Sequence, residues 1–434
     1  MNTLRFGVNY IPSKGWLRRT GPLDTDATAR DLEAIRSLGC DHIRMHLMWD
    51  MFQPEPNGIN PVAMDNLTRT LDLCREIGLE ACVTVFNGWM SGFIFKPTWA
   101  QGNMFTSPNI LEGELYLLRA LGEAIGNHPA LFGIDIGNEL NVLAGSEPFD
   151  SVEGDRWNNR IVDCATRCFP GKIIVNGVDH QSWFPTNYAF SRRVLANTAS
   201  LTSLHTWIEF TGARAYGDES DHVMHLQDFM IELARAYSAD PARPVWIEEY
   251  GISPMWLPPE RHENFLRNAI GNALTCEDVF GITYWCSHDI DRALRGFEQK
   301  GEFRPFNPLE YDLGLFDTAN RIKPNGVVLR DIIRRYRDGY APMVKNTAIV
   351  IDDDNISTDS VNVGPAVRVR YVEDGDEEEY TIVGARESDP MNNRISNECP
   401  VGSALLGHRT GEVVTVEAPD GPMQLEILDI RRAD

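Results

Sequence analysis

The first 340 residues alternate between short apolar runs and longer stretches with helical periodicity, and this alternation constrains the fold most strongly. Strands are predicted at Leu4–Asn9, His42–Met45, Leu79–Phe86, Leu131–Ile136, Lys172–Asn176, Leu201–His205, Val245–Glu249 and Gly281–Trp285. Helices are predicted at Thr25–Leu38, Pro61–Ile77, Ile110–Ile125, Asp155–Cys168, Asp221–Tyr237, Glu260–Thr275 and Gly326–Arg337. Strands joined through helices pair in parallel, so eight such units predict a closed (β/α)8 barrel.

A doubly wound open sheet is the alternative arrangement of the same elements. Sheets of that kind usually carry a glycine-rich phosphate turn after the first strand. The turn here reads N-Y-I-P-S-K-G-W from Asn9 to Trp16 and has no such motif, which favours the barrel. The segment from Trp183 to Val194 gives no clear prediction.

The loops that follow the predicted strands are long and rich in aromatic residues. In a barrel these loops form the face that carries the active site. Part of the aromatic set should pack as a core beneath the loops, and the rest should offer flat surfaces on which a sugar ring stacks. The set is Trp16, Trp49, Trp89, Phe93, Phe95, Trp99 and Trp256.

The pattern changes after about Tyr340, where helical periodicity stops and short alternating segments begin. Four of them read A-V-R-V-R-Y-V, E-Y-T-I-V-G, E-V-V-T-V and Q-L-E-I-L-D-I, with Gly-containing turns between them. We therefore expect two domains, a barrel over residues 1–340 and a small strand-rich domain over residues 341–434. The acidic runs of the second domain, such as Glu373–Glu379, are typical of a solvated face.

The chain is acidic, with a net charge of −23. This charge disfavours non-specific binding to nucleic acid or to an anionic membrane. No apolar run is long enough for a membrane span, and the N-terminus reads as a strand, not as a signal peptide. The eight cysteines are scattered and mostly lie in apolar patterns, which is typical of reduced cysteines in a cytoplasmic protein. They show no spacing that indicates a zinc site.

Two of the predicted strands end in carboxylates. The fourth leads into Asn138-Glu139, and the seventh into Glu248-Glu249-Tyr250-Gly251. Cleavage of a glycosidic bond with retention needs two carboxyl groups about 5–5.5 Å apart, one ionised and one protonated. We expect Glu139 and Glu249 to form this pair. Glu248 leaves an ambiguity, since strand alternation should point Glu248 and Glu249 in opposite directions and only one can face the sugar.

On these motifs, residues of about 4 to 340 resemble the retaining glycoside hydrolases of clan A, and family 5 in particular. The resemblance implies that Glu139 is the general acid/base and that Glu249, directly before an aromatic residue and Gly, is the nucleophile. It also implies that the reaction needs no metal or organic cofactor.

The resemblance assigns further positions one by one. Arg44 of H-I-R-M-H would hydrogen-bond the nucleophile, and Asn138 would bind the sugar 2-hydroxyl. His205 would contact the acid/base region, and Trp285 would form the floor of the sugar site. Trp207 replaces the usual Tyr, which puts a phenol hydrogen bond to the nucleophile in doubt. Asn87 stands where the family often has His, with Trp89 close by; His46, His180 and His288 are expected to be polar pocket or surface residues.

The opening G-V-N-Y-I-P-S-K-G-W and the heavy loops resemble the bacterial β-mannosidase branch of family 5. This resemblance implies a retaining exo-β-mannosidase that acts on short β-mannosides such as mannosyl-N-acetylglucosamine. A β-glucosidase or an endo-β-glycanase on the same barrel is the alternative.

The tail, from about Ala348 to Ile430, resembles the C-terminal, FKBP-like domain of the Gre transcript-cleavage factors. The matching stretches are Tyr380–Gly384, Ser388–Pro390, Ile395–Gly407 and Gly411–Gly421. In that family the domain docks on RNA polymerase, while a separate coiled coil carries the activity. The barrel precedes the tail here, so the resemblance does not imply transcript cleavage. Polymerase docking, packing of the tail on the barrel and a homo-oligomer contact remain open.

Overall fold

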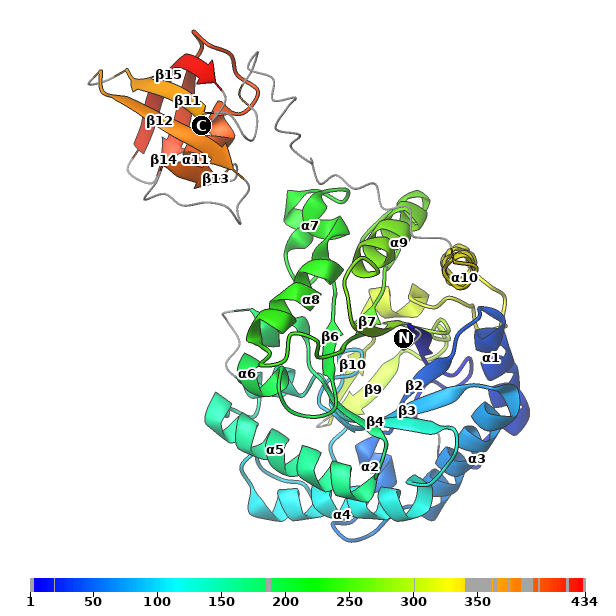
Figure 1. Cartoon of the computed structure of the whole chain (residues 1–434). Helices are drawn as coiled ribbons and strands as arrows, with labels where there is room; N and C mark the ends of the chain where they lie inside the picture. Colours follow the sequence, from blue (N-terminus) through cyan, green and yellow to red (C-terminus); the bar gives the residue numbers. More distant parts are fainter. Residues whose placement is uncertain are drawn as a thin grey trace. The chain divides into compact units, whose positions relative to one another are not determined.

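The computed structural model describes residues 4–18, 20–184, 189–299, 301–339, 361, 366–372, 375–383, 393–396, 399–418 and 421–431. The chain divides into two compact units, Met1–Val344 and Lys345–Asp434, both drawn in Figure 1. The boundary expected between residues 340 and 341 lies outside the described residues.

The first unit is built on an eight-stranded, parallel sheet, as the sequence predicted. The sheet order is β5-β4-β3-β2-β1-β8-β7-β6, so the first and last strands of the barrel pair with each other. All predicted strands are present, and their ends differ from the prediction by at most two residues. They are β1 (Arg5–Asn9), β2 (His42–His46), β3 (Glu80–Asn87), β4 (Leu131–Asn138), β5 (Ile173–Gly177), β6 (Thr202–His205), β7 (Val245–Tyr250) and β8 (Val279–Tyr284).

Hydrogen bonds near β5 and β6 close the sheet into a barrel. The amide of Ser200 donates to the carbonyl of Ile174 at 2.8 Å. The hydroxyl of Ser203 donates to the carbonyl of Asn176 at 2.6 Å. The strands are buried on both faces, which explains why they read as nearly continuous apolar runs in the sequence.

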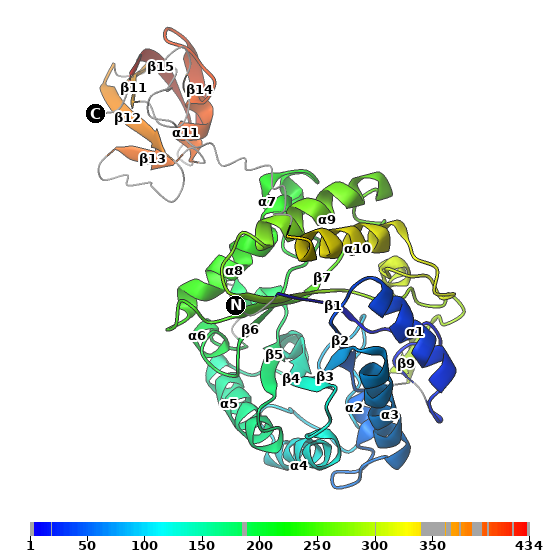
Figure 2. The same ribbon diagram turned by 45° about the vertical axis from the view of Figure 1, so that its right-hand side comes forward.

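Helices form an outer ring around the strands (Figure 1). Their bounds are α1 (Thr25–Ser37), α3 (Pro61–Ile77), α4 (Pro108–Ile125), α5 (Ser151–Cys168), α8 (Leu226–Tyr237), α9 (Pro259–Ala273) and α10 (Pro324–Arg337). Figures 1 and 2 show α10 between α9 and α1, where it completes the ring. The predicted start of α1 is confirmed, since the Asp24 side chain accepts from the amide of Ala27. Gly39 ends this helix with φ of +89°, a conformation that glycine adopts readily.

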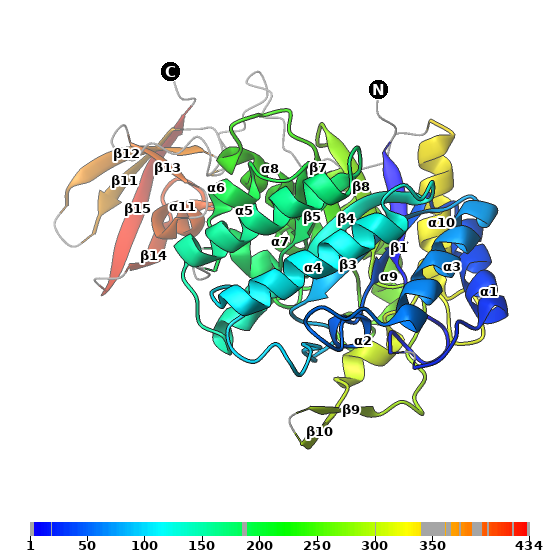
Figure 3. The ribbon, with the colours of Figure 1, turned by 90° about the horizontal axis from the view of Figure 1, so that it is seen from below.

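Several short elements were not predicted. The helix expected over Asp221–Tyr237 is broken at His225 into α7 (Asp221–Met224) and α8. The segment without a clear prediction contains part of η2 (His180–Trp183) and of α6 (Arg192–Leu195), and residues 185–188 lie outside the described residues. Elements of this length are too short for a periodic signal. The others are α2 (Trp49–Phe52), η1 (Leu140–Gly145), η3 (Ala213–Tyr216), η4 (Pro308–Asp312) and the hairpin of β9 (Gly296–Gln299) and β10 (Glu302–Pro305), which Figure 3 shows projecting from the barrel.

Most of the loop aromatics pack against one another. Trp16, Phe93 and Phe95 form one cluster with Phe297 and Phe306, with ring centroids 5.0–6.3 Å apart. In a second contact Trp49 meets Trp99 edge to face, with centroids 5.8 Å apart. These rings hold the long loops over the barrel. Trp89 and Trp256 are the two predicted loop aromatics outside these contacts.

The second unit is a small strand-rich domain, as predicted. Its five-stranded sheet has the order β13-β12-β11-β15-β14, and all neighbours are antiparallel except β12 and β13. Core side chains such as Val367, Ile382 and Leu425 are fully buried. In the expected solvated acidic run, Glu377 and Glu379 pair with arginines near the surface. The elements are β11 (Ala366–Tyr371), β12 (Glu377–Val383), β13 (Arg394–Ser396), α11 (Pro400–Leu405), β14 (Val413–Ala418) and β15 (Gly421–Arg431).

Two further predictions from the sequence concern the cysteines and membrane-spanning segments. All eight cysteines are free, and five of them are buried. Among the helices of the described residues, none combines the length and the apolar content that a membrane crossing requires.

Candidate active site

Polar side chains gather where the barrel strands end. Parallel strands of a barrel present their carboxyl ends on one face, so residues far apart in the sequence meet there. The contributing residues are Asn9 at the end of β1, Arg44 in β2, Asn138 and Glu139 at the end of β4, His205 at the end of β6, Glu249 in β7 and Trp285 after β8.

The carboxyl groups of Glu139 and Glu249 lie close to each other, as predicted from the sequence. The His205 Nδ1 atom is 3.0 Å from Oε1 of Glu139 and 3.4 Å from Oε2 of Glu249. One ligand atom from each of these three residues lies within 4.8 Å of the other two. This separation fits the carboxyl spacing of about 5–5.5 Å in retaining glycosidases and is shorter than the roughly 6.5–9.5 Å of inverting ones.

The backbone turns sharply at Glu139. This residue has φ of +50°, a left-handed conformation that is uncommon for a residue with a side chain. Its amide donates to the carbonyl of Gly177 at 2.7 Å, and η1 begins at the next residue. The turn leaves Asn138 buried in the barrel and places the Glu139 side chain, 13% exposed, at the cavity.

Arg44 is the central cation beneath this pair, and its side chain is fully buried. Nη1 donates to Oε1 of Glu249 at 2.6 Å, and Nη2 donates to Asp135 at 2.6 Å and to Asn138 at 2.8 Å. Nε lies 3.1 Å from Glu248. Burial alone would lower the pKa of Arg44, but the three carboxylates outweigh burial and raise it. The guanidinium therefore stays charged and orients these four side chains, and it also donates to Asn9.

The surroundings of Glu249 have opposing effects on its pKa. Burial, with a contribution from the charge of Glu139, raises the pKa of Glu249 to about 7, while His205 and Arg44 act against this rise. The indole Nε1 of Trp207 donates to Oε2 of Glu249 at 3.3 Å. At this position the donor to Glu249 is therefore the indole N–H of Trp207 and not the phenol of the usual Tyr.

The side chains of Glu248 and Glu249 have different surroundings, but they do not point to opposite faces of β7. Both carboxylates contact the Arg44 guanidinium, at 3.1 Å for Glu248 and 2.6 Å for Glu249. The expectation of opposite directions is wrong because the register between β7 and β8 shifts between Ile247 and Tyr250. Glu249 lines the cavity, whereas Glu248 is fully buried below it. Burial opposes ionisation of Glu248, but Arg44 and His205 lower its pKa on balance.

His205 is held between these acids and is fully buried. Burial alone would lower the pKa of the imidazole, but Glu249, Glu139 and Glu248 raise it to about 10. At neutral pH the ring is then doubly protonated. The ligand atoms of Glu139, His205 and Glu249 lie close enough together for a single metal ion, and the same spacing brings Nδ1 of His205 to both carboxylates.

A cavity of about 440 Å³ opens above the acid pair. Four of the predicted substrate-binding residues line it with the two acids. Two of the loop aromatics line it as well, Trp89, which is one of these four, and Trp256. The lining residues are Trp89, Met90, Ser91, Asn138, Glu139, Trp207, Phe210, Glu249, Trp256, Trp285, Leu309, Glu310 and Leu313. Indole rings beside paired carboxyl groups suit a sugar, because a pyranose offers C–H groups for stacking and hydroxyls for hydrogen bonds.

The remaining predicted residues lie below or beside this cavity. Arg44 and His205 contact the acids from beneath. Asn87 is not among the lining residues, and its side-chain amide donates to the carbonyl of Leu47. The histidines expected to be polar pocket or surface residues, His46, His180 and His288, are all buried, and none is among the residues that line this cavity.

Some residues of the site were not predicted. The amide of Asn9 donates to the carbonyl of Glu248 at 3.0 Å, and its Oδ1 accepts from Arg44 at 3.0 Å. Asp135 accepts from Arg44 and from the hydroxyl of Thr84. A signal for Asp135 existed, since a charged residue inside an apolar strand needs a buried partner. Glu310 lies in a long loop, where the sequence carries no periodicity to place it.

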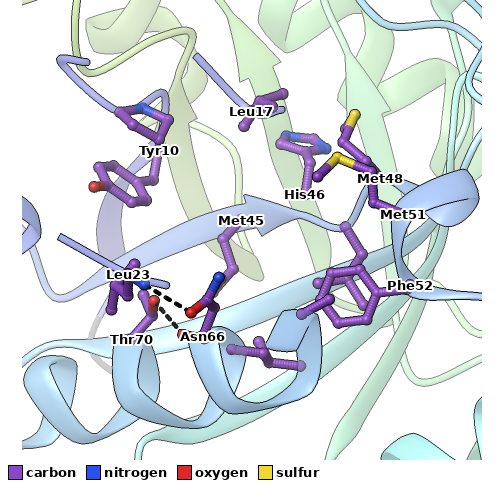
Figure 4. Close-up of a pocket in the computed structure, with 14 residues that line it drawn as sticks. Tyr10, Leu17, Leu23, Met45, His46, Met48, Met51, Phe52, Asn66 and Thr70 are labelled. Atoms are coloured by element: carbon purple, nitrogen blue, oxygen red, sulfur yellow. Dashed lines mark hydrogen bonds between the residues drawn. The ribbon is translucent and has the colours of Figure 1, made fainter. Parts of the chain in front are cut away.

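A second cavity, of about 630 Å³, lies beside β2 and α3 (Figure 4). Its lining is mostly apolar and includes Met45, Met51 and Phe52. Its Asn66 side chain accepts from the amide of Leu23 and donates to the carbonyl of Gly21. As far as the chain is described, no carboxylate lines this cavity, and its titratable lining side chains are Tyr10 and His46.

Comparison with known proteins separates the two units. Residues 356–432 match the family model of the C-terminal region of the transcription elongation factors GreA and GreB. Over 90 residues the chain is 52% identical to the transcription elongation factor GreA of Thermoanaerobacter pseudethanolicus. This alignment covers 21% of the chain and 57% of that GreA, so the chain spans little more than half the length of the curated relatives it matches.

Solved structures match most of the chain. The crystal structure of a GH5_18 from Bifidobacterium longum subsp. infantis is 32% identical, covers 78% of this chain and 80% of its own, and superposes with a TM-score of 0.72. A glutamate-to-alanine variant of GH5_18 from Streptomyces cattleya, in complex with Manβ1-4GlcNAc, is 33% identical. That match covers 77% of this chain and 81% of the other, with a TM-score of 0.72.

Proposed function

Because the chain belongs to the GH5_18 glycoside hydrolases, we propose that it is a retaining exo-β-mannosidase that cleaves short β-mannosides such as Manβ1-4GlcNAc. The observation that carries the mechanism is the approach of Glu139 and Glu249 around His205, within 4.8 Å. The choice of sugar is supported by a relative, since a variant of the Streptomyces cattleya GH5_18 has been crystallised in complex with this disaccharide.

In the first step Glu249 attacks the anomeric carbon of the mannoside. Glu139 gives its proton to the glycosidic oxygen, the bond between that oxygen and the anomeric carbon breaks, and a mannosyl ester of Glu249 forms. Arg44, Trp207 and His205 all favour the ionised form of Glu249. A proton on Glu139 removes the negative charge that contributes to the raised pKa of Glu249, so this distribution of protons suits the reaction.

In the second step water replaces the enzyme at the same carbon. Glu139, now ionised, takes a proton from the water while the ester bond to Glu249 breaks, so two inversions give net retention. The exposure of Glu139 at the cavity supports this role, because the acid/base residue must meet both the leaving sugar and the incoming water.

The test compares two activities of the purified chain. We expect release of mannose from Manβ1-4GlcNAc, and faster hydrolysis of nitrophenyl β-mannoside than of the corresponding β-glucoside. Glu249→Ala should lower the rate by several orders of magnitude, as expected for the loss of a nucleophile. Glu260→Ala, an exposed carboxylate on α9, is the matched control and should keep the wild-type rate.

A β-glucosidase or an endo-β-glycanase on the same acid pair is the alternative. Equal or reversed activity on the two nitrophenyl glycosides would overturn the mannoside assignment and leave the mechanism standing. Release of internal fragments from a β-mannan would overturn the exo assignment.

For the second unit we propose contact with RNA polymerase, on the single observation that residues 356–432 match the GreA/GreB C-terminal model. Co-purification of polymerase with the full chain, and its loss when Lys345–Asp434 is removed, is the expected result. If both forms retain polymerase equally, or neither does, this proposal is wrong. A cytoplasmic location, expected from the sequence, would be consistent with such a contact.

A further inference from the structure

A third carboxyl group lies in the wall of the active-site cavity. Glu310 belongs to η4, within the long segment between β8 and α10, and lines the cavity together with Leu309 and Leu313. The element is fixed on both sides of Glu310. The Asn307 side chain caps its start, and the hydroxyl of Tyr311 donates to a loop carbonyl at 2.9 Å.

One side chain orients this carboxylate. The hydroxyl of Ser91 donates to Oε2 of Glu310 at 2.9 Å. Ser91 itself has φ of +51° and lies in a tight turn that Met90 and Phe93 close with two backbone hydrogen bonds of 2.9 Å. A residue with a side chain seldom adopts this conformation, so the turn holds Ser91 in place at some cost in free energy.

Among the residues that the structure describes, no cation pairs with Glu310. Within the part of the chain that the structure describes, its hydrogen bond comes from Ser91 and no ion pair reaches it. The lining of the cavity contains Glu139, Glu249 and Glu310, and neither lysine nor arginine. Burial, with the charges of Glu139 and Glu249, raises the pKa of Glu310 to about 7. Glu310 is half-buried and its hydrogen bond comes from a neutral hydroxyl, so no salt bridge offsets the free-energy cost of removing its charge from water.

A bound sugar would supply the missing hydrogen bonds. Hydroxyl groups donate to a carboxylate, and two hydroxyls on neighbouring carbons can donate to it together. We propose that Glu310, oriented by Ser91, accepts hydrogen bonds from hydroxyls of the sugar in this cavity and thereby determines specificity for a fully hydroxylated, neutral glycoside. This inference rests on the proposed hydrolase function of the site and adds a recognition group to it.

The test pairs variants of Glu310 with substrates that each lack one hydroxyl. For the parent nitrophenyl β-mannoside we expect Glu310→Ala to lower kcat/KM about 100-fold, as one or two hydrogen bonds to a charged group imply. Glu310→Gln keeps the shape and one acceptor and should lose less. Glu302→Ala, an exposed glutamate on the neighbouring hairpin, is the matched control.

The decisive comparison is whether the effect of Glu310→Ala on kcat/KM depends on the hydroxyl that the substrate lacks. For the deoxy-mannoside that lacks the recognised hydroxyl, Glu310→Ala should cost less than about threefold, because the contact is already absent. The proposal is overturned if the cost of Glu310→Ala on the parent is below threefold, or if it is the same for every deoxy analogue. Thermal melting of each variant shows whether a loss of activity is caused by unfolding. If Glu310→Ala unfolds, Glu310→Gln is compared with the wild type on the same substrates.

The proposed mannosidase function can fail separately. If the wild type prefers the β-glucoside, the sugar assignment is wrong, and the same pairing with deoxy-glucosides still tests Glu310. If the wild type cleaves the mannoside and the coupling is absent, the assignment of Glu310 is wrong and the mannosidase function stands.

Discussion

Replacement of Trp207 by phenylalanine tests how the site keeps its nucleophile ionised. The indole Nε1 donates to Oε2 of Glu249 at 3.3 Å, and the ring packs edge to face on Trp256 with centroids 5.7 Å apart. Phenylalanine retains an aromatic ring for this packing and removes the donor. Arg44 still donates to the other carboxylate oxygen, at 2.6 Å. We therefore expect Trp207→Phe to lower the activity without abolishing it.

The size of the effect follows from the geometry. A hydrogen bond to an ionised group contributes roughly 1.5–3 kcal/mol. The bond here is longer than the 2.7–2.9 Å typical of strong charged pairs, so the lower end applies. Since about 1.4 kcal/mol corresponds to one pKa unit, the pKa of Glu249 should rise by about one unit from its value of about 7.

The sign of the pH effect is fixed by the role of Glu249. The nucleophile reacts when ionised, so a higher pKa moves the acidic limb of the kcat/KM profile upward by about one pH unit. Activity at pH values below both pKa values should fall about tenfold, and the two enzymes should converge at alkaline pH. The assay is kcat/KM for nitrophenyl β-mannoside across pH, with thermal melting as a folding control. An acidic limb that stays in place or moves downward in a folded variant would refute this reasoning.

Three further predictions concern the buried charges. Arg44→Met should lower the free energy of unfolding by at least about 3–5 kcal/mol in urea titrations, because it leaves buried carboxylates without their shared cation; an unchanged midpoint would contradict this. The raised pKa of His205 adds stability below about pH 6.5 that is lost as pH rises through about 10, so His205→Asn should flatten the decline of Tm over that window, and an equal decline in both proteins would count against it. Glu248→Gln should keep kcat within about tenfold, whereas Glu249→Gln should lose at least about 1,000-fold, and the reverse order would exchange their roles.

The sequence predicted the parts of the fold and site that regular structure determines. Each barrel strand carried a local signal, and a parallel barrel brings strand ends together wherever they lie in the sequence. Glu139 and Glu249 could therefore be paired across 110 positions without any knowledge of the loops. Arg44 was assigned from the resemblance to the family, and its place inside an apolar strand agrees with that assignment, because a buried charge needs a partner.

What could not be predicted depends on irregular backbone. The register shift in β7 turns Glu248 toward Arg44, although alternation alone would point it elsewhere. Ser91 and Glu310 are far apart in the sequence and meet only through the shapes of two loops, which no periodicity records. Asn87 follows the rule for strand ends, yet its amide is taken by the carbonyl of Leu47.

The central claim is that Glu249 forms a covalent bond to the sugar during the reaction. A mannosyl fluoride with fluorine in place of the 2-hydroxyl slows the breakdown of such an intermediate more than its formation, so the labelled enzyme accumulates and its peptides can be read by mass spectrometry. We predict a single added fluoromannosyl group on the peptide that contains Glu249, located on that residue by fragmentation. A label on Glu139 or Glu248, or turnover of the reagent without any labelled peptide, would contradict the account.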